Sequence, residues 1–214
     1  MRVKKRDGTY VPVRLDEITD RITPLCEDLD QKFIDPVKIT LEVVEKIDDG
    51  ISTSHLDSFT AEICHAKAIE HPHFNVLASR LIISDHQKNV QILANLKFSQ
   101  VCHLLYTNTD QLGDQCPMIS DELYEISQVN KDTIDNLVVN DRDFLLDYFG
   151  FKTLAKSYLL RVGGKIVETP QHMFMRLALG IHGKIKTIEK RDGQEFEKIY
   201  EPNYDLVEET YDLI

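Results

Sequence analysis

Apolar residues recur every three or four positions along most of this chain, which is the spacing of an amphipathic helix. Over residues 1–93 this pattern predicts four helices, bounded by Asp, Ser or Thr, Pro and Gly. We expect Asp16 and Asp35 to be N-caps, Ser52 or Thr53 to cap the third helix, and a fourth helix to begin near Phe74. The expected buried positions are Ile18, Ile22, Leu25, Cys26 and Leu29; Ile39, Val43 and Ile47; Leu56, Phe59, Ile63, Ala66 and Ile69; and Leu77, Ala78, Leu81, Ile82, Ile92 and Leu96.

The first fifteen residues predict a β-hairpin ahead of these helices. Two short extended runs flank Asp7-Gly8, a pair that favours a two-residue turn with positive φ at both positions. The hairpin carries five basic residues against one acid, in a chain of net charge −11. Such a local concentration of positive charge on an acidic protein indicates a site for an anion, and we expect a phosphate on a small ligand.

The second half of the chain keeps helical spacing and adds two hairpin signals. Residues 141–151 hold four aromatics, interpreted as core beneath a second domain, and Gly163-Gly164 predicts a tight turn. Thr169-Pro170 opens a helix that ends at Gly180 or Gly183. A charged stretch at about 184–203, with a turn signal at Asp192-Gly193, precedes an amphipathic helix over 204–214 that stops as if cut.

These patterns predict a mainly α fold with small β elements (α+β). The expected domains are 1–93, 94–155 and 156–214, with the charged stretch as an insertion in the last.

Composition narrows the classes of function. No apolar run reaches the roughly 18 to 20 residues of a membrane span, and the charged N-terminus is unlike a secretory signal, so we expect a cytoplasmic protein. The cysteines have no Cys-x-x-Cys spacing, and the Cys64-His65 and Cys102-His103 pairs point in different directions on a helix. We therefore expect reduced thiols, no metal site and no catalytic cysteine.

Two sets of short motifs carry a family resemblance. The first set is Val3-x-Lys5-Arg6-Asp7-Gly8 with Asp16 and Ile18, Thr53-x-x-x-Asp57, Ala78-x-Arg80-Leu81 and Lys88. The second is Asp141-Arg-Asp-Phe144, Tyr148-Phe-Gly-Phe-Lys-Thr-Leu154, Ser157-Tyr-Leu-Leu160, Pro170-Gln-His-Met173, Met175-Arg176, Gly180-Ile-His182 and Glu209-Thr-Tyr211. Together they resemble the N-terminal part of the large, catalytic subunit of class I ribonucleotide reductase, including its ATP-cone domain.

This resemblance implies an allosteric activity site in which a hairpin covers a four-helix bundle and the pocket between them binds ATP as activator or dATP as inhibitor. Carried over by position, Lys5, Arg6 and Lys88 face the phosphates, and Thr53 and Asp57 are polar contacts on the ribose and phosphate side. Mg²⁺ can accompany the nucleotide, and no other cofactor is implied for this chain. Asp16 belongs to the same motif.

Two positions depart from the pattern of such cones. Val11 and Glu17 stand where the family usually carries Glu and Lys, which removes an acceptor on the base side and replaces a cation by an acid. An alternative therefore stays open, in which a degenerate cone acts only as a structural or oligomerisation module. A nucleotide-sensing repressor, which also uses a cone, would need a metal-binding finger that this sequence lacks.

For the whole enzyme, the resemblance implies reduction of ribonucleoside diphosphates for DNA replication. The catalytic cysteines follow the point where this chain ends, and residues from 156 onward begin an α/β barrel. The implied partners are a second large subunit, a larger ring of large subunits with dATP, a small di-iron radical subunit, and thioredoxin or glutaredoxin. Nucleic acid and membrane are not among them.

Overall fold

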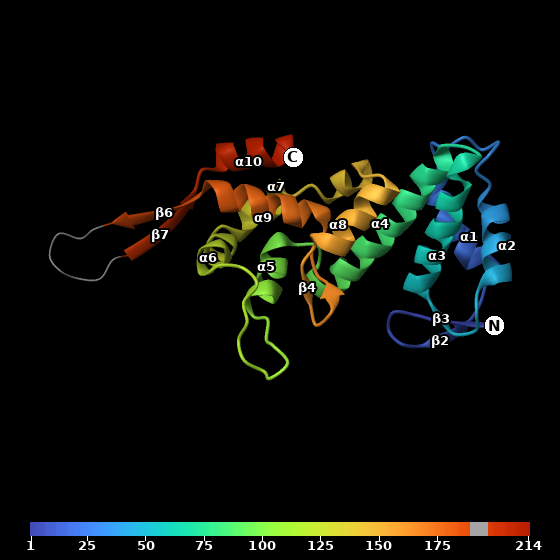
Figure 1. Ribbon diagram of the computed structural model, residues 1–214, viewed down its shortest axis with the longest axis horizontal. Helices are drawn as coiled ribbons and strands as arrows, with labels where there is room; N and C mark the ends of the chain where they lie inside the picture. Colours follow the sequence, from blue (N-terminus) through green and yellow to red (C-terminus); the bar gives the residue numbers. More distant parts are fainter. Residues whose placement is uncertain (189–196) are drawn as a thin grey trace. The chain divides into compact units, whose positions relative to one another are not determined.

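A computed structural model describes residues 1–188 and 197–214, and side chains within them except at 184–188 and 197–201. The chain divides into two compact units (Figure 1). Unit 1 comprises Met1–Lys88 and Phe144–Lys152, and unit 2 comprises Asn89–Asp143 and Thr153–Ile214. Helices dominate both units and the strands are short, which confirms the expected fold class.

Unit 1 is a group of helices with a small sheet at one end (Figure 1). The sheet has the order β2-β1-β3, with β1 antiparallel to β2 and parallel to β3. The elements are β1 (Arg2–Lys4), β2 (Tyr10–Pro12), α1 (Leu15–Ile22), a 3-10 turn η1 (Thr23–Cys26), α2 (Pro36–Lys46), β3 (Ile51–Ser52), α3 (Thr53–Ala66), η2 (Lys67–Ile69) and α4 (His73–Ala94), the last belonging to unit 1 as far as Lys88. The hairpin and the four helices are confirmed, whereas the third strand was not expected.

The turn of the hairpin is longer than the two-residue turn that we predicted. Strand pairing stops at Lys4 and Tyr10, and of the loop residues only Gly8 has positive φ, at 90°. The Asp7 carboxylate accepts hydrogen bonds from the Thr9 backbone N–H at 2.9 Å and its hydroxyl at 2.7 Å. The Gly8 N–H donates to the Lys5 carbonyl at 3.0 Å, so the turn runs from Lys5 to Gly8 and Gly8, at its end, takes the positive φ.

One of the predicted helix starts is wrong. Asp16 does not cap α1, because the helix begins at Leu15 after Arg14 and the Asp16 carboxylate pairs with the Arg14 guanidinium at 2.5 Å. Asp35 is confirmed as the cap of α2, accepting from the N–H groups of Val37 and Lys38. Ser52, not Thr53, caps α3 by accepting from the His55 N–H.

Several predicted core positions lie at the surface. Ile69 is 94% exposed because α3 has already ended at Ala66, and Ile92 is 66% exposed. On α4 the positions Ile83, Val90 and Ala94 are buried instead. Since this helix contributes to both units, its buried residues do not form one continuous stripe.

The aromatic segment 144–152 belongs to unit 1, which corrects the interpretation that it forms core beneath a second domain. The Tyr148 ring stacks on His65 of α3 with centroids 4.4 Å apart, and Phe151 meets the edge of His86 of α4 at 5.3 Å. Phe149 stays 73% exposed. Contacts between such distant parts of the chain cannot be read from local periodicity.

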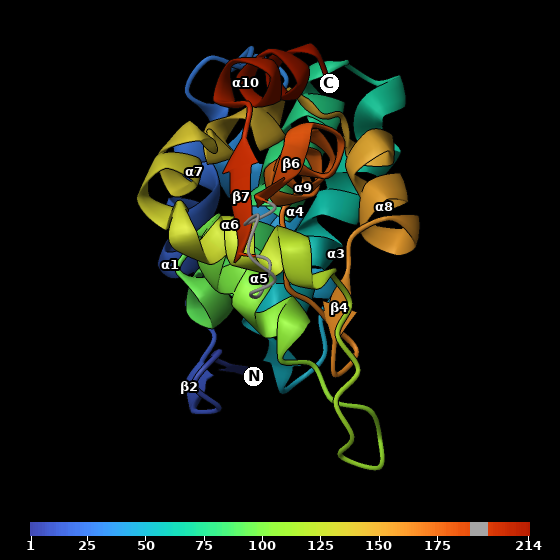
Figure 2. The same ribbon diagram turned by 90° about the vertical axis from the view of Figure 1, so that its left-hand side faces the viewer.

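Unit 2 has its own core, formed chiefly by the helices over residues 98–106, 121–129, 170–182 and 204–213. Its elements are α5 (Phe98–Tyr106), α6 (Asp121–Val129), α7 (Lys131–Leu137), η3 (Asn140–Leu145, shared with unit 1), α8 (Tyr148–Ser157, from Thr153), β4 (Arg161–Val162), β5 (Lys165–Ile166), α9 (Pro170–His182), β6 (Gly183–Ile188), β7 (Glu197–Pro202) and α10 (Tyr204–Leu213). Helices α9 and α10 lie side by side (Figure 2).

The turn predictions in unit 2 are largely confirmed. Gly163 and Gly164 have φ of 55° and 80°, as a tight hairpin requires. Thr169 caps α9 in a capping box with His172, and the helix ends before Gly183. Strands β6 and β7 pair antiparallel within the charged stretch, and its turn signal at Asp192-Gly193 lies outside the described residues.

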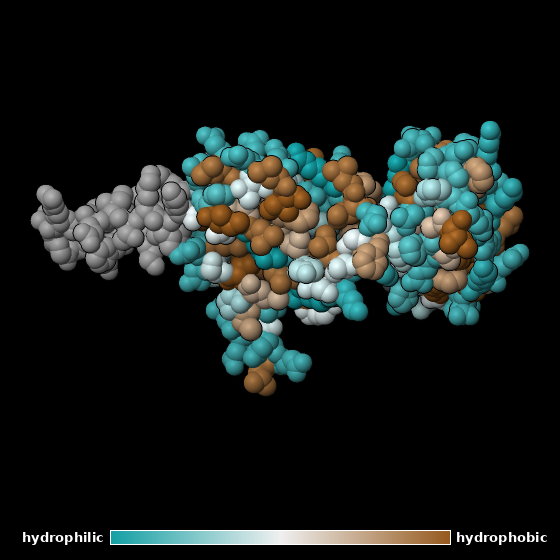
Figure 3. Space-filling model, turned by 45° about the horizontal axis from the view of Figure 1, so that its top comes forward, coloured by the Kyte–Doolittle hydropathy of each residue, from teal (hydrophilic) through white to brown (hydrophobic). Residues whose placement is uncertain are grey.

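Apolar side chains also remain on the surface of α9 and α10, including Ile181 at 65% and Leu213 at 79% exposure. In the space-filling view, hydrophobic patches interrupt the polar surface (Figure 3). These side chains add nothing to the core of unit 2. No helix in the described ranges is long and apolar enough to cross a membrane.

The cysteines differ sharply in accessibility, which predicts their reactivity. Burial raises the pKa of Cys26 to about 11 and those of Cys64 and Cys102 to about 12, whereas Cys116 is exposed. Because the thiolate is the reactive form, we expect one fast-reacting thiol in the native protein at pH 8 and four after denaturation, measured with a disulfide reagent. Cys116→Ser should remove the fast phase. A fast phase that persists in this variant would contradict the assignment.

Candidate functional site

The pairing of β1 with β3 places the hairpin loop beside the start of α3. Val3 pairs with Ile51 and Lys4 with Ser52, and α3 begins at the next residue, Thr53. The loop that follows Lys4 therefore lies at the N-terminus of this helix. A helix N-terminus has unpaired N–H groups and a partial positive charge, which favour anions.

Four charged side chains from the hairpin loop and three helices meet next to this point. Arg6 of the loop donates a short hydrogen bond to the Asp85 carboxylate of α4, and its Nη2 lies 4.0 Å from Oδ2 of Asp57 on α3. Arg21 of α1 donates to the same Asp57 oxygen from Nε and Nη2, each at 3.2 Å. We call these four residues the arginine–aspartate cluster.

Two serines add hydrogen bonds to the arginine–aspartate cluster. The Ser54 hydroxyl donates to Oδ2 of Asp85 at 2.7 Å, and Arg21 donates to Oγ of Ser84 at 3.0 Å. Asp57 and Asp85 are buried, at 7% and 5% exposure. Buried carboxylates need charged or hydrogen-bonding partners, and each of these has both.

Lys88 of α4 is the charged group with spare hydrogen-bonding capacity at this place. It is exposed and forms no ion pair with any residue in the described ranges. Desolvation lowers the pKa of its ammonium, and the charges of Arg21 and Arg6 act in the same direction. The Lys88 ammonium therefore interacts electrostatically with the cluster and is accessible to an anion from solvent.

Burial also changes the acid–base behaviour of Asp57. Desolvation raises the pKa of this carboxyl above its ordinary value, the neighbouring Asp85 raises it further, and Arg21 opposes both. The cluster therefore holds a carboxylate whose charge is costly and depends on the adjacent arginine.

The other predicted site residues lie in the hairpin, in α1 and at the start of α3. Lys5 pairs with Glu17 of α1 at 3.0 Å, and both side chains are well exposed. Thr53 is the first residue of α3 and is half-buried, and Val11 lies on β2 opposite Val3. Asp16 is exposed and pairs with Arg14, away from Arg6 and Asp57 as far as its contacts show.

Arg21, Ser54 and Asp85 are the residues that the sequence analysis missed. Each stands three or four positions from a predicted site residue on the same helix: Arg21 follows Glu17, Ser54 precedes Asp57, and Asp85 precedes Lys88. Residues at this spacing share a helix face. A search for polar neighbours at that spacing could have found all three.

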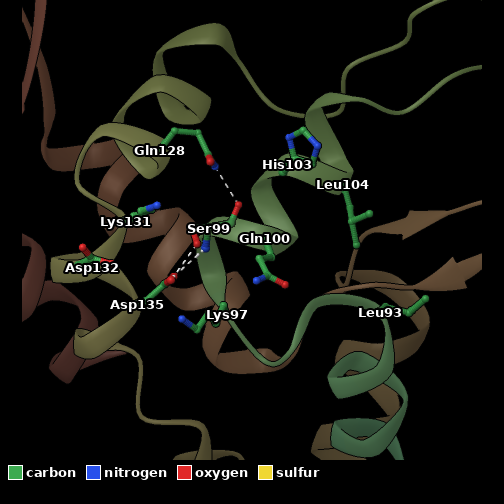
Figure 4. Close-up of a pocket in the computed structure, with 10 residues that line it drawn as sticks. All are labelled: Leu93, Lys97, Ser99, Gln100, His103, Leu104, Gln128, Lys131, Asp132 and Asp135. Atoms are coloured by element: carbon green, nitrogen blue, oxygen red, sulfur yellow. Dashed lines mark hydrogen bonds between the residues drawn. The ribbon is translucent and has the colours of Figure 1, made fainter.

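A separate cavity of about 380 Å³ lies in unit 2, against α5 and α7 (Figure 4). Three of its polar residues are bonded to one another: Asp135 accepts from the N–H and hydroxyl of Ser99 at 2.8 Å each, and Gln128 donates to the Ser99 carbonyl. It holds none of the predicted site residues. In the part of the chain that the structure describes, no three His, Cys, Asp or Glu side chains gather in a way that could hold a metal ion.

Comparison with known families decides what kind of protein this is. The family described as ATP cone domain matches residues 1–89, and the family described as ribonucleotide reductase, all-alpha domain, matches residues 144–214. The chain belongs to the ribonucleotide reductase large-subunit family. The cone match covers the sheet, the arginine–aspartate cluster and Lys88.

Individual relatives agree with this membership. The chain is 46% identical to ribonucleoside-diphosphate reductase large chain 2 of Saccharomyces cerevisiae over 184 residues, which are 86% of this chain and 21% of the relative. It is 41% identical to the large chain of Schizosaccharomyces pombe over 86% of this chain and 22% of the relative. The large subunit of Danio rerio is also 41% identical, over 85% of this chain and 22% of the relative. The chain thus spans about a fifth of the length of these relatives.

Arg21 and Arg14 are predicted to contribute differently to stability, because Arg21 pairs with a buried carboxylate and Arg14 with an exposed one. Arg21→Ala leaves the buried Asp57 charge without its closest partner, so we expect the free energy of unfolding to fall by about 2 kcal/mol at pH 7. Arg14→Ala is the matched control, because both partners of the Arg14–Asp16 pair are about 60% exposed, and it should cost less than about 0.5 kcal/mol.

The Arg21→Ala loss should also depend on pH. The pKa of Asp57 is higher in the folded state than its value of 3.8 in the unfolded chain. Protonation of this carboxyl therefore stabilises the folded state at low pH, and this stabilisation is lost as the pH rises through the folded-state pKa. The destabilisation should therefore be smallest near pH 4 and grow towards pH 7, measured by urea denaturation. Equal losses in both arginine variants, or a loss unchanged with pH, would contradict this view of Asp57.

Proposed function

We propose that unit 1 binds ATP as activator or dATP as inhibitor and so regulates a ribonucleoside-diphosphate reductase. The convergence of Arg6, Arg21 and Lys88 beside the start of α3 is the observation that carries this proposal. These cations come from a loop and two helices, so they can surround a polyphosphate from several sides. The helix start adds backbone N–H groups to the same anion.

Asp57 and Thr53 are the proposed contacts beyond the phosphates. Asp57 faces Arg6 and Arg21, and Thr53 opens the helix on which Asp57 lies. A carboxylate beside a nucleotide can accept a hydrogen bond from a ribose hydroxyl, a group that ATP has and dATP lacks at the 2′ position. Mg²⁺ is proposed to enter with the nucleotide.

The proposal for the whole protein follows from the family. We propose that the regulated reaction is the reduction of ribonucleoside diphosphates and that this chain alone is inactive. Residues 156–214, which we expected to begin a barrel, lie within the match to the all-alpha domain instead. The buried state of Cys26, Cys64 and Cys102 supports the view that they take no part in catalysis. The partners proposed for the whole enzyme are a second large subunit, a radical-bearing small subunit and a thioredoxin or glutaredoxin.

A structural module without ligand is the second candidate, and the Lys5–Glu17 pair favours it. This pair holds one of the predicted phosphate cations at 3.0 Å from an acid. The pair is exposed, however, and exposed pairs contribute roughly 0 to 1 kcal/mol, so a phosphate can displace Glu17 at little cost. We therefore prefer nucleotide binding.

Thermal unfolding separates the two candidates. A ligand at about one hundred times its dissociation constant stabilises the folded protein by about 2.7 kcal/mol, so ATP and dATP should both raise the unfolding temperature. Adenosine at the same concentration is the control for contacts to the base and sugar alone. No shift with either triphosphate, on protein shown to be folded, would leave the structural module as the better account.

Lys88→Ala tests the phosphate contact directly. Because Lys88 is exposed and has no ion pair among the described residues, its removal should change the free energy of unfolding by less than about 0.5 kcal/mol. The affinity for ATP, measured by calorimetry, should fall about tenfold, the effect of losing one charge-assisted hydrogen bond. Lys38→Ala is the control, since the Lys38 side chain on α2 is 82% exposed and, within the described residues, forms an ion pair only with Asp35. Unchanged ATP affinity in Lys88→Ala would remove this residue from the site.

A further inference from the structure

Three cations of the proposed phosphate site already form ion pairs with acidic side chains of the protein. Arg6 is bonded to Asp85, Arg21 to Asp57, and Lys5 to Glu17. The four residues of the arginine–aspartate cluster therefore carry no net charge together. A polyphosphate that enters must compete with these carboxylates for the same N–H donors.

The three acids differ in how strongly they can compete. Glu17 is well exposed, so water screens its charge and can replace its partner. Asp57 is buried but is a proposed polar contact of the nucleotide itself. Asp85 is buried at 5% exposure, holds Arg6 by a short hydrogen bond and is fixed from its other oxygen by Ser54.

We propose that Asp85 is a built-in competitor of the effector's phosphates and sets the affinity of the nucleotide site. This inference rests on the proposed nucleotide binding and adds a residue to it. Asp85 holds Arg6 in the structure, and binding requires Arg6 to turn from this carboxylate to a phosphate. The Asp85 charge then remains buried near the bound anion, where like charges repel more strongly than in water.

The position of Asp85 suits this role better than a purely structural one. Lys88 lies one helical turn further along α4, and the Asp85 charge partly offsets the lowering of the Lys88 pKa by the two arginines. One acid thus acts on two of the proposed phosphate cations, by holding Arg6 and by attracting Lys88. The repulsion should grow with the charge of the ligand and vanish for an uncharged one.

Asp85→Asn tests the proposal, because the amide keeps the shape, its oxygen can still accept from Arg6, and its NH2 group can donate to the Ser54 hydroxyl. We expect the affinity for ATP, measured by calorimetry at fixed Mg²⁺, to rise about tenfold, which corresponds to about 1.4 kcal/mol. The gain should be smaller for ADP, smaller again for AMP and absent for adenosine. A purely structural role of Asp85 would not produce this order.

Two controls match the change in charge. Glu17→Gln removes the exposed acid and should raise ATP affinity by less than about threefold. Asp28→Asn removes the acid of the Arg80–Asp28 pair, which contacts none of the cluster residues, and should leave ATP affinity unchanged. Circular dichroism checks that each variant is folded, and Asp85→Ala, which also removes the charge, replaces Asp85→Asn if that variant misfolds.

The outcomes separate this inference from the proposed function. If the unchanged protein binds ATP and Asp85→Asn binds it equally or more weakly, the inference is overturned and the nucleotide site stands. If only Asp85→Asn binds ATP, the competitor role is supported in its strongest form. If neither protein binds ATP or dATP, both the nucleotide site and the role of Asp85 are overturned.

Discussion

The parallel pairing of β1 with β3 is the constraint on which the site in unit 1 depends. Two residue pairs, Val3 with Ile51 and Lys4 with Ser52, join the N-terminus to the strand that leads directly into α3. The register fixes where the cationic loop lies along that helix. A slip by one residue would turn every side chain of β1 to the other face and move Arg6 away from Asp57.

Opposite charges then hold the loop in place, and this has a cost for binding. Arg6 and Arg21 each form an ion pair with a buried aspartate, so the positive and negative charges of the arginine–aspartate cluster balance each other. The two aspartates also offset the repulsion between the two arginines. An entering anion has to replace existing contacts, so affinity depends on the balance between carboxylate and phosphate.

Under the nucleotide binding that we propose for unit 1, this balance has a regulatory meaning. A regulatory site benefits from moderate affinity, because an effector that always stays bound reports nothing about its concentration. Buried acids offer a way to lower affinity without losing the cations that recognise phosphate. The chain spans about a fifth of the length of the relatives that it matches.

The sequence by itself determined the hairpin, the four helices of the cone, the Asp35 and Thr169 caps and the Gly163-Gly164 turn, because these depend on neighbours in the chain. Motif resemblance also predicted Arg6, Asp57 and Lys88 as site residues. Only the tertiary structure decided that β3 joins the sheet, that Tyr148 packs on His65, and that Asp85 pairs with Arg6 across 79 positions. Such contacts link residues that no local spacing relates, so their partners become visible only when the chain is folded.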